Sequence, residues 1–248
     1  MNNITGVILA AGMGKRLGAI TKDKPKALVE VGEKALLDYA IKFIDKIGIK
    51  NKIVVGGYCF DQIKKHVDKK YSRDVVLVEN SKYELQNLVS FSKALELIDG
   101  EKGLLVCNAD YIFNQSTVDA VKNNMGDLAV YCSFDLSGNE EDVMKVKVDK
   151  TGNMTTISKT LSDFDCIYTG IFFIPAADIG LLKEITRDIL STQDNKITTV
   201  ECLFPEFIRR GRVVKIVDIG PADWLEIDTP EELNIAQKIK YENGHQGQ

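Results

Sequence analysis

Short apolar runs alternate with longer amphipathic stretches along the first half of the chain. The apolar runs predict buried strands at residues 7–10, 52–56, 74–78 and 103–107. Between them, apolar residues recur at helical spacing, which predicts helices at residues 35–47, 60–70 and 85–98. Because these strands are apolar on both faces, we expect the α/β class, with a mostly parallel sheet covered by helices on both sides.

The pattern changes in the second half of the chain. Strands are predicted at residues 128–132, 143–149 and 154–157, the last two joined by a turn at 150–153. These two segments predict an antiparallel hairpin inserted beside the sheet, and residues 166–174 return as a long strand. Helices are expected at 178–190 and 199–209, where packing, a lid and a dimer surface all stay open as roles.

A loop of small residues follows the first predicted strand. Gly12 and Gly14 allow the backbone to turn and to approach a ligand closely, and consecutive free N–H groups in such a turn bind anions. Lys15 and Arg16 add two cationic donors suited to phosphate oxygens. The loop therefore predicts a polyphosphate site, with Lys26 as a third cation close behind it.

Spacing excludes two familiar phosphate-binding motifs. The dinucleotide fingerprint needs a third glycine at position 17, where this chain has Leu17. The P-loop needs Ser or Thr after its Gly-Lys pair, whereas Gly14-Lys15 is followed by Arg16. Both a nicotinamide-dependent oxidoreductase and a P-loop NTPase are therefore excluded.

The same stretch resembles the nucleotidyltransferase family that couples an NTP to a phosphorylated sugar or alcohol and releases pyrophosphate. The resemblance rests on Ala10-Ala11-Gly12-Met13-Gly14-Lys15-Arg16-Leu17, Thr21 and Pro25-Lys26-Ala27-Leu28. It implies a Rossmann-like sheet of the nucleotide-diphospho-sugar transferase type in a single domain, 1–248, with an NTP-binding half (1–125) and an acceptor-binding half (126–248). It also implies catalytic roles for Arg16 and Lys26, and nucleotide contacts from Leu9, Ala10, Ala11, Gly12, Met13, Gly14, Lys15, Arg16 and Ala109.

Two acids are the candidate metal ligands. Asp110 lies just past the fourth buried strand, where a carboxylate is costly to bury unless it binds something. A polyphosphate requires Mg²⁺, which carboxylates hold together with water and phosphate oxygens. The resemblance adds Asp228, in the sequence Ile227-Asp228-Thr229, as the second ligand. Next to it, Thr229, Pro230 and Glu232 predict the capped start of a final helix.

The acceptor site is predicted from the second half of the chain. The resemblance assigns Lys159 to the acceptor phosphate, although Ser-Lys-Thr replaces the usual Glu-Lys-Pro there. Tyr168 and Gly170 lie inside the long strand, where a glycine often marks a close approach by a ligand, and Glu226 borders the same region. The acceptor itself stays open between phosphocholine, inositol phosphate and another small phosphorylated polyol or aminoalcohol. A phosphocholine cage would draw on the aromatic residues Tyr111, Tyr168, Phe172 and Trp224.

The nucleotide base is predicted to be cytosine. Ala10-Ala11 and residues 79–90 are similar to the choline-phosphate and inositol-1-phosphate cytidylyltransferases. In the latter segment, the amides of Gln86 and Asn87 offer the donor and acceptor that cytosine requires. The alternatives are a sugar-1-phosphate uridylyl-, thymidylyl- or guanylyltransferase, and a non-catalytic nucleotide-sensing module. Retention of Arg16, Lys26 and both acids argues against the sensor.

Composition excludes other classes of partner. A net charge of −4 and an isoelectric point near 5.4 do not suggest nucleic-acid binding. No apolar run approaches the ~18 residues that span a bilayer. The five cysteines are far apart and lack C-x-x-C spacing, which predicts reduced core residues in a cytoplasmic protein. His66 is expected to be solvated on a charged helix. A homo-oligomer is possible, and the sequence does not decide the oligomeric state.

Overall fold

Four parallel strands form the centre of the structure. A computed structural model of the chain describes residues 3–71, 73–136, 142–192, 198–220 and 224–245. The parallel strands lie in the order β6 (Gly103–Asn108), β1 (Ile4–Ala10), β4 (Asn51–Gly56) and β5 (Val75–Glu79). Their carboxyl ends meet at one edge of the sheet, so the glycine loop after β1 lies beside Asp110 after β6. The predicted parallel sheet is confirmed.

The later strands continue the same sheet, which has nine strands in total. β11 (Cys166–Ile174) runs antiparallel to β6 and also pairs with β8 (Ala129–Ser133), whose other neighbour is β12 (Lys215–Asp218). The predicted hairpin is β9 (Lys145–Val148) with β10 (Met154–Ser158). It joins the start of β11 through β9, so it extends the main sheet.

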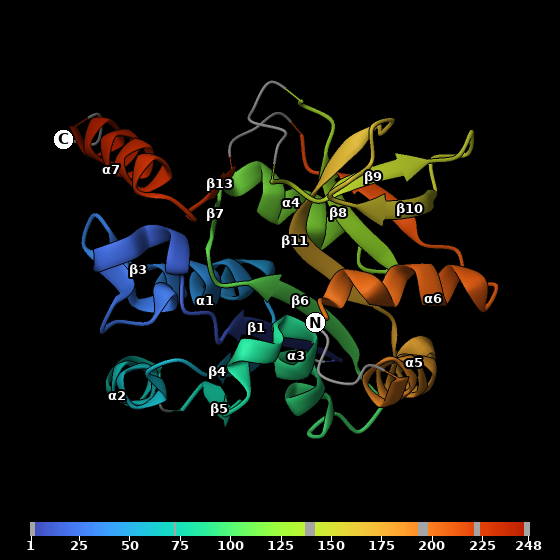
Figure 1. Cartoon of the computed structure of the whole chain (residues 1–248), viewed down its shortest axis with the longest axis horizontal. Helices are drawn as coiled ribbons and strands as arrows, with labels where there is room; N and C mark the ends of the chain where they lie inside the picture. The colour runs from blue at the N-terminus through green and yellow to red at the C-terminus, as the bar shows by residue number, and fades with distance from the viewer. Residues whose placement is uncertain (1–2, 72, 137–141, 193–197, 221–223, 246–248) are drawn as a thin grey trace.

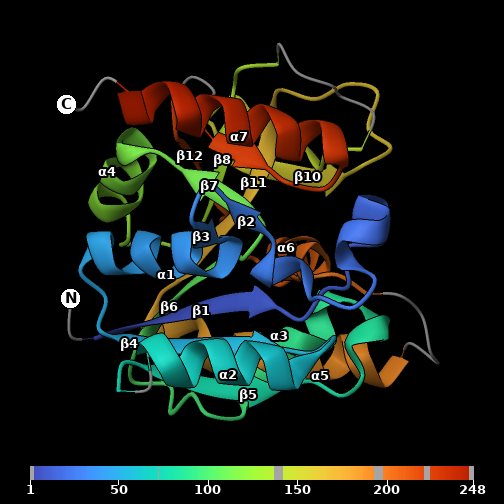
Figure 2. The same cartoon turned by 90° about the vertical axis from the view of Figure 1, so that its left-hand side faces the viewer.

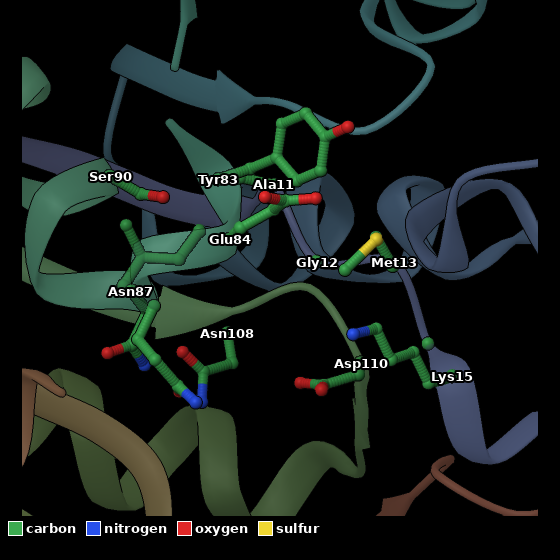
Figure 3. A pocket seen from close by; sticks show the side chains of 13 residues that line it. Ala11, Gly12, Met13, Lys15, Tyr83, Glu84, Asn87, Ser90, Asn108 and Asp110 are labelled. Atoms are coloured by element: carbon green, nitrogen blue, oxygen red, sulfur yellow. The ribbon is translucent and has the colours of Figure 1, made fainter. Parts of the chain in front are cut away.

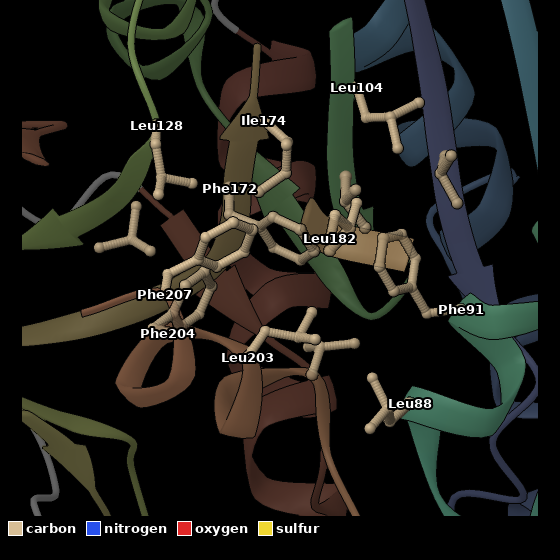
Figure 4. Close-up of a cluster of buried hydrophobic side chains, with 14 of the residues drawn as sticks. Leu88, Phe91, Leu104, Leu128, Phe172, Ile174, Leu182, Leu203, Phe204 and Phe207 are labelled. Carbon is tan, nitrogen blue, oxygen red and sulfur yellow. The ribbon is translucent and has the colours of Figure 1, made fainter. Parts of the chain in front are cut away.

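Helices cover both faces of the sheet (Figures 1 and 2). On one face pack α3 (Asn87–Leu95), α5 (Ile179–Thr192) and α6 (Leu203–Arg209). On the other pack α1 (Leu36–Ile47), α2 (Phe60–Tyr71) and α4 (Gln115–Asn123). Alternate residues of β1 enter the two cores, as side chains of a buried strand must. Figure 4 shows the first core, where Phe172 packs edge-on against Phe91 and Phe204.

Several predicted boundaries shift. The helix expected at 85–98 is a short turn, η3 (Tyr83–Leu85), followed by α3, because Gln86 adopts a φ of 75° that breaks the helical backbone. Turns η4 (Ala176–Asp178) and η5 (Val200–Cys202) likewise precede α5 and α6. None of the described helices combines the length and apolarity needed to cross a membrane.

Two small ribbons and the last helix bring the C-terminal part of the chain to the glycine loop. β7 (Tyr111–Phe113) pairs with β13 (Trp224–Glu226), and β2 (Glu30–Val31) pairs with β3 (Lys34–Ala35). α7 (Pro230–His245) packs on β2, and a third apolar cluster joins them to the turn η1 (Lys15–Thr21). Its buried members are Leu17, Val29, Val31, Leu36, Ile227 and Ala236. This cluster fixes the loop relative to the C-terminal acids.

Candidate active site

The glycine loop is folded tightly onto Lys26. Gly14 has a φ of 68°, and a Cβ atom placed there would lie 2.9 Å from Cβ of Lys26. The Thr21 hydroxyl donates to the Gly14 carbonyl oxygen at 2.7 Å, which closes the turn. Lys26 itself begins the turn η2 (Lys26–Leu28) after Pro25. Glycine is therefore required at position 14 both for its backbone conformation and for the space that Lys26 takes.

The β7–β13 ribbon brings the two predicted metal ligands together. Tyr111 lies opposite Glu226, and the Ile227 amide donates to the Asp110 carbonyl oxygen at 3.0 Å. Asp110 and Asp228 therefore emerge at the same end of the ribbon, although 118 positions separate them in sequence. One carboxylate oxygen each from Asp110, Glu226 and Asp228 lies within 4.8 Å of the others. The acids and the glycine loop thus lie on one side of the sheet.

Lys26 bridges two of these acids. Its Nζ lies 2.6 Å from Oδ2 of Asp110 and also donates to Asp228. Burial, with only 7% of the residue exposed, acts to lower the pKa of Lys26, but the charges of Asp110 and Asp228 outweigh it and raise the pKa. The ammonium group therefore stays protonated at neutral pH. Arg16, which is half exposed, also pairs with Asp228.

Glu226 is a third carboxylate of the same cluster. The sequence placed it in the acceptor site, and the structure places it both there and beside Asp110 and Asp228. Burial, and then the charges of Asp110 and Asp228, raise the pKa of Glu226 to about 8, while Lys26 and a hydrogen bond with Tyr111 act against the rise. Three acids held this close are costly without a cation between them.

The carboxylate cluster fits a magnesium ion. Oδ1 of Asp110 is buried and has no hydrogen-bond partner among the described residues. Mg²⁺ binds hard oxygen ligands and is usually held by a few carboxylates, with water and phosphate oxygens completing its coordination. The unpaired oxygen and the acids beside it are a donor set that such an ion could use, and Glu226 is a third candidate ligand that the sequence did not predict.

A first cavity of about 380 Å³ opens over the glycine loop (Figure 3). Its walls come from the loop after β1, from the turn before α3 and from the end of β6. It is lined by the predicted nucleotide residues Leu9, Ala11, Gly12, Met13, Gly14, Lys15, Gln86 and Asn87. Tyr83, Glu84, Ser90, Asn108 and Asp110 complete the lining. A cavity of this size next to the loop, lined by both polar and apolar residues, is suited to a nucleotide.

A second cavity of about 330 Å³ adjoins the first. The two share Gln86, Asn87, Asn108 and Asp110. The second is also lined by predicted acceptor and catalytic residues, namely Arg16, Lys159, Tyr168, Glu226 and Asp228. Two ligands bound in these cavities would meet at Asp110.

Some predicted residues lie elsewhere. Ala10 and Ala109 line neither cavity; both side chains are buried in the core under α1, so a nucleotide contact there would involve the backbone. Gly170, with a φ of 73°, is approached by the ring of Tyr111, which a Cβ atom would meet at 2.9 Å. The close contact with Tyr111 therefore explains the glycine at this position, without a ligand. Phe172 is fully buried in the core and cannot contribute to an aromatic cage.

The lining residues that were not predicted include Asn108, Asp142 and Glu201. Asn108 follows from the same argument as Asp110, since it ends the same strand. Asp142 pairs with Arg16 and, at 2.5 Å, with Nζ of Lys159, but in the sequence it is one of several acids in a polar stretch. Glu201 lies in the segment expected to be an ordinary helix, and nothing in the sequence distinguishes it.

Comparisons with known proteins identify the family and the fold. Residues 6–144 match the family described as MobA-like NTP transferase domain. The chain is 30% identical to the CTP:phosphoglutamine cytidylyltransferase of Campylobacter jejuni, over 94% of this chain and 98% of that protein. Two solved structures share its fold. The inositol-1-phosphate CTP transferase from T. maritima has a TM-score of 0.78 at 23% identity, covering 95% of this chain and 96% of that one. The CTP:phosphocholine cytidylyltransferase from Streptococcus pneumoniae has a TM-score of 0.76 at 22% identity, covering 96% and 99%.

Proposed function

Because the chain belongs to the MobA-like NTP transferase domain family, we propose that it transfers the cytidylyl group of CTP to a small phosphorylated alcohol and releases pyrophosphate. Phosphocholine and inositol 1-phosphate are acceptors of the expected size. The choice of CTP is supported by the relatives, since the similar proteins compared above are named for CTP.

One observation carries the proposal: two cavities adjoin at Asp110, and cations and acids surround the junction. A hydrolase would need room for only one phosphorylated substrate and a water molecule. Joining two phosphorylated molecules requires two adjacent sites and charge compensation between them. The first cavity supplies a site for the nucleotide and the second a site for the acceptor.

The reaction is an in-line displacement at the α-phosphorus. An oxygen of the acceptor phosphate attacks this atom, the bond to the bridging oxygen of the β-phosphate breaks, and pyrophosphate leaves with the bonding electrons. The backbone N–H groups of Gly12, Met13 and Gly14, together with Lys15, would hold the β- and γ-phosphates in the first cavity. Arg16, which lines the second cavity and pairs with Asp228, would reach these phosphates from the junction. The protein's contribution is to position two anions that repel each other and to stabilise the charge that develops.

Lys26 would lie at the reacting phosphorus. Its buried ammonium group lies at Asp110, where the cavities meet, and its raised pKa keeps it charged. A cation fixed there neutralises the α-phosphoryl oxygens without reorganising during the reaction. Lys159 in the second cavity would hold the acceptor phosphate, releasing Asp142 as it does so.

Asp110, Asp228 and Glu226 would hold the magnesium ion. When bound, the ion would supply the positive charge that lets the two phosphates approach each other. The three carboxylates keep this charge at the junction of the cavities and orient the side chain of Lys26, which already spans two of them.

Pyrophosphate release tests the proposal. The purified protein with Mg²⁺ is given each of CTP, UTP, dTTP and GTP in turn, with a panel of phosphorylated alcohols and sugar 1-phosphates. We expect CTP with a phosphorylated alcohol to be the best pair. A best pair that combines UTP, dTTP or GTP with a sugar 1-phosphate would assign the chain to that class of transferase instead, and no release with any pair would favour a nucleotide sensor.

A further inference from the structure

Three residues that line the second cavity each have a buried polar atom without a partner among the described residues: Asp110, which the proposed metal would satisfy, and Tyr168 and Glu201. Oε2 of Glu201 and the hydroxyl oxygen of Tyr168 are both buried there without a hydrogen bond. An unpaired buried polar group costs about 1–3 kcal/mol, so folded proteins rarely keep one that nothing else will pair. Two such atoms lining the same cavity indicate that a ligand satisfies them.

The two atoms belong to one subsite. Both side chains line the second cavity, and the pKa of Tyr168 is raised by burial and then by the charge of Glu201. Burial also raises the pKa of Glu201. Lys159 pairs with Asp142 at 2.5 Å, and its charge acts to lower the pKa of Glu201 by less than burial raises it.

Glu201 is held in a fixed position. The Thr199 side chain hydrogen-bonds to its carboxyl group. The next residue, Val200, donates its backbone N–H to Oδ1 of Asn87 at 2.9 Å, and the Leu88 amide donates to the Thr198 carbonyl oxygen at 3.3 Å. The turn η5 is thereby tied to the start of α3. Such a site is preorganised, so a ligand does not bear the cost of ordering it.

The charges of the cavity favour a cationic group in this subsite. Lys26, Arg16 and the proposed metal compensate Asp110, Asp228 and Glu226, and Asp142 has its own cationic partners. Glu201, by contrast, forms no ion pair with any of the described residues. A group with N–H donors satisfies both the carboxylate and the phenol oxygen at once.

The aromatic residues exclude a different kind of cation. A quaternary ammonium has no N–H donors and binds the open faces of aromatic rings. Tyr111 and Tyr168 are only 6% and 3% exposed. Tyr111 stacks on Phe113, and Tyr168 packs edge-on against Phe204. Their hydroxyl groups, more than their ring faces, therefore define this part of the cavity.

We propose that the acceptor is a small phosphorylated amino alcohol, whose primary ammonium group binds Glu201 and Tyr168. The inference rests on the proposed function, because it takes the second cavity to be the acceptor site. It assigns Glu201 and Tyr168 as the residues that determine acceptor specificity.

Three acceptors of nearly the same size test this proposal. Phosphoethanolamine carries a primary ammonium, 2-hydroxyethyl phosphate a neutral hydroxyl group, and phosphocholine a quaternary ammonium. With CTP and Mg²⁺, kcat/KM for phosphoethanolamine should exceed that for each of the others by about 10- to 100-fold. Equal efficiencies, or a preference for phosphocholine, would overturn the proposal.

Two variants test which residues cause the preference for phosphoethanolamine. Glu201→Gln removes the charge and Tyr168→Phe removes a single oxygen atom. Each should reduce the ratio of kcat/KM between phosphoethanolamine and 2-hydroxyethyl phosphate to within a few-fold of one, while KM for CTP stays within about twofold. Glu206→Gln, on the same segment but in an ion pair with Arg209 on the surface, should keep the wild-type ratio. A wild-type ratio in both site variants would overturn the assignment.

A binding measurement separates this inference from the proposed function. If no acceptor supports pyrophosphate release, the proposed function fails, and calorimetric titration decides the subsite by itself. Phosphoethanolamine should then still bind more tightly than 2-hydroxyethyl phosphate, and Glu201→Gln should abolish the difference. Equal binding of the two compounds by the wild-type protein would overturn the ammonium subsite.

Discussion

At the scale of single residues, Lys26 connects the two halves of the proposed chemistry. It is a buried cation with a carboxylate on each side, and it lies where the two cavities meet. Such a group is costly to bury and is retained where its charge is used. Its position explains why Gly14, Pro25 and Thr21 accompany it, since all three shape the backbone around it.

Replacing Lys26 tests this role. We expect Lys26→Ala to lower kcat for pyrophosphate release by about 10²–10³, because a fixed charge at the reacting phosphoryl group is lost. KM for CTP should change much less, since the loop and Lys15 still hold the nucleotide. Steady-state rates measured across CTP concentrations separate the two effects.

Lys24 provides the matched control. It lies two residues away on the same segment, its side chain is 38% exposed, and its only ion pair with a described residue is with Glu30 at 3.8 Å. Lys24→Ala should keep the wild-type rate. A rate for Lys26→Ala within threefold of wild type would contradict its catalytic role.

Single residues also show what the sequence reveals about a site. Arg16, Lys26, Asp110 and Asp228 were predicted because each follows a motif or ends a buried strand, and the structure brings them together. Glu201 and Asp142 were missed for a physical reason. Each contacts the site through a segment that is distant in sequence, and neither the local polarity nor the spacing of an acid shows what it will face after folding.

At the scale of elements, the start of α7 positions Asp228. The predicted cap is confirmed: Oε2 of Glu232 accepts from the Thr229 amide at 2.8 Å, and the Glu232 amide donates to the Thr229 hydroxyl at 3.3 Å. The same carboxylate oxygen accepts from the Asp228 amide at 2.7 Å. The capping box therefore fixes the backbone of a proposed metal ligand as well as the helix end.

Removing this cap should affect both stability and metal use. We predict that Glu232→Ala lowers the free energy of unfolding by about 1 kcal/mol and raises the Mg²⁺ concentration needed for half-maximal rate several-fold. Glu232→Gln should restore both, because a glutamine oxygen can accept the same bonds. Chemical denaturation and a magnesium titration give the two readouts.

The control for this experiment is the neighbouring acid of the first turn. Glu231 is exposed, and Glu231→Ala should leave the magnesium requirement as in wild type. An unchanged requirement in Glu232→Ala would show that the cap stabilises the helix without positioning Asp228.

A polar cluster between α1 and α2 was not predicted. His66, expected to be solvated, lies 2.7 Å from Oδ1 of Asp38. The same oxygen accepts from the Tyr71 hydroxyl, and Oδ2 accepts from the Lys70 ammonium, each at 2.8 Å. Burial acts to raise the pKa of Asp38, but the hydrogen bonds from His66, Lys70 and Tyr71 outweigh it and lower the pKa. The helical periodicity of residues 60–70 predicts which face of this helix is polar. It does not show that α1 supplies an acid, Asp38, to that face.

This cluster makes stability depend on pH. Because the pKa of Asp38 is lower in the folded state than the ~3.9 of an unfolded aspartate, its contribution is present above about pH 4 and is lost as the pH falls further. Asp38→Asn should lower the free energy of unfolding at pH 7 by about 2 kcal/mol, and the difference from wild type should shrink below pH 4. Denaturation curves at several pH values measure it, with the exposed Asp68→Asn as the control. A difference that grows as the pH falls would contradict this account.

At the scale of the whole molecule, the sheet was predictable and the ribbons were not. Apolar runs of four to six residues identify buried strands because a strand covered on both faces has no polar side. β7 and β13 are three residues long and half exposed, so they lack this signal. Their pairing nevertheless brings Asp110 to Asp228. The proximity of these two acids was predicted only from the resemblance to a family.

The whole molecule also explains why two substrates can meet. The first cavity is lined by residues 9–110, whereas the second adds side chains from residues 142–228. Their shared wall lies at the carboxyl end of β6, next to the antiparallel β11. Ligand sites of open α/β sheets occur at this edge, at the carboxyl ends of the strands.

The most direct test of the account is ³¹P NMR of one reaction mixture. It contains the protein, CTP, Mg²⁺ and equal amounts of phosphoethanolamine, phosphocholine and inositol 1-phosphate. We predict that each CTP consumed yields one pyrophosphate and one cytidylyl pyrophosphate diester, and that excess EDTA stops both until Mg²⁺ is restored. Conversion of CTP to CMP without the diester, or a rate unaffected by EDTA, would contradict metal-dependent transfer at the junction of the two cavities.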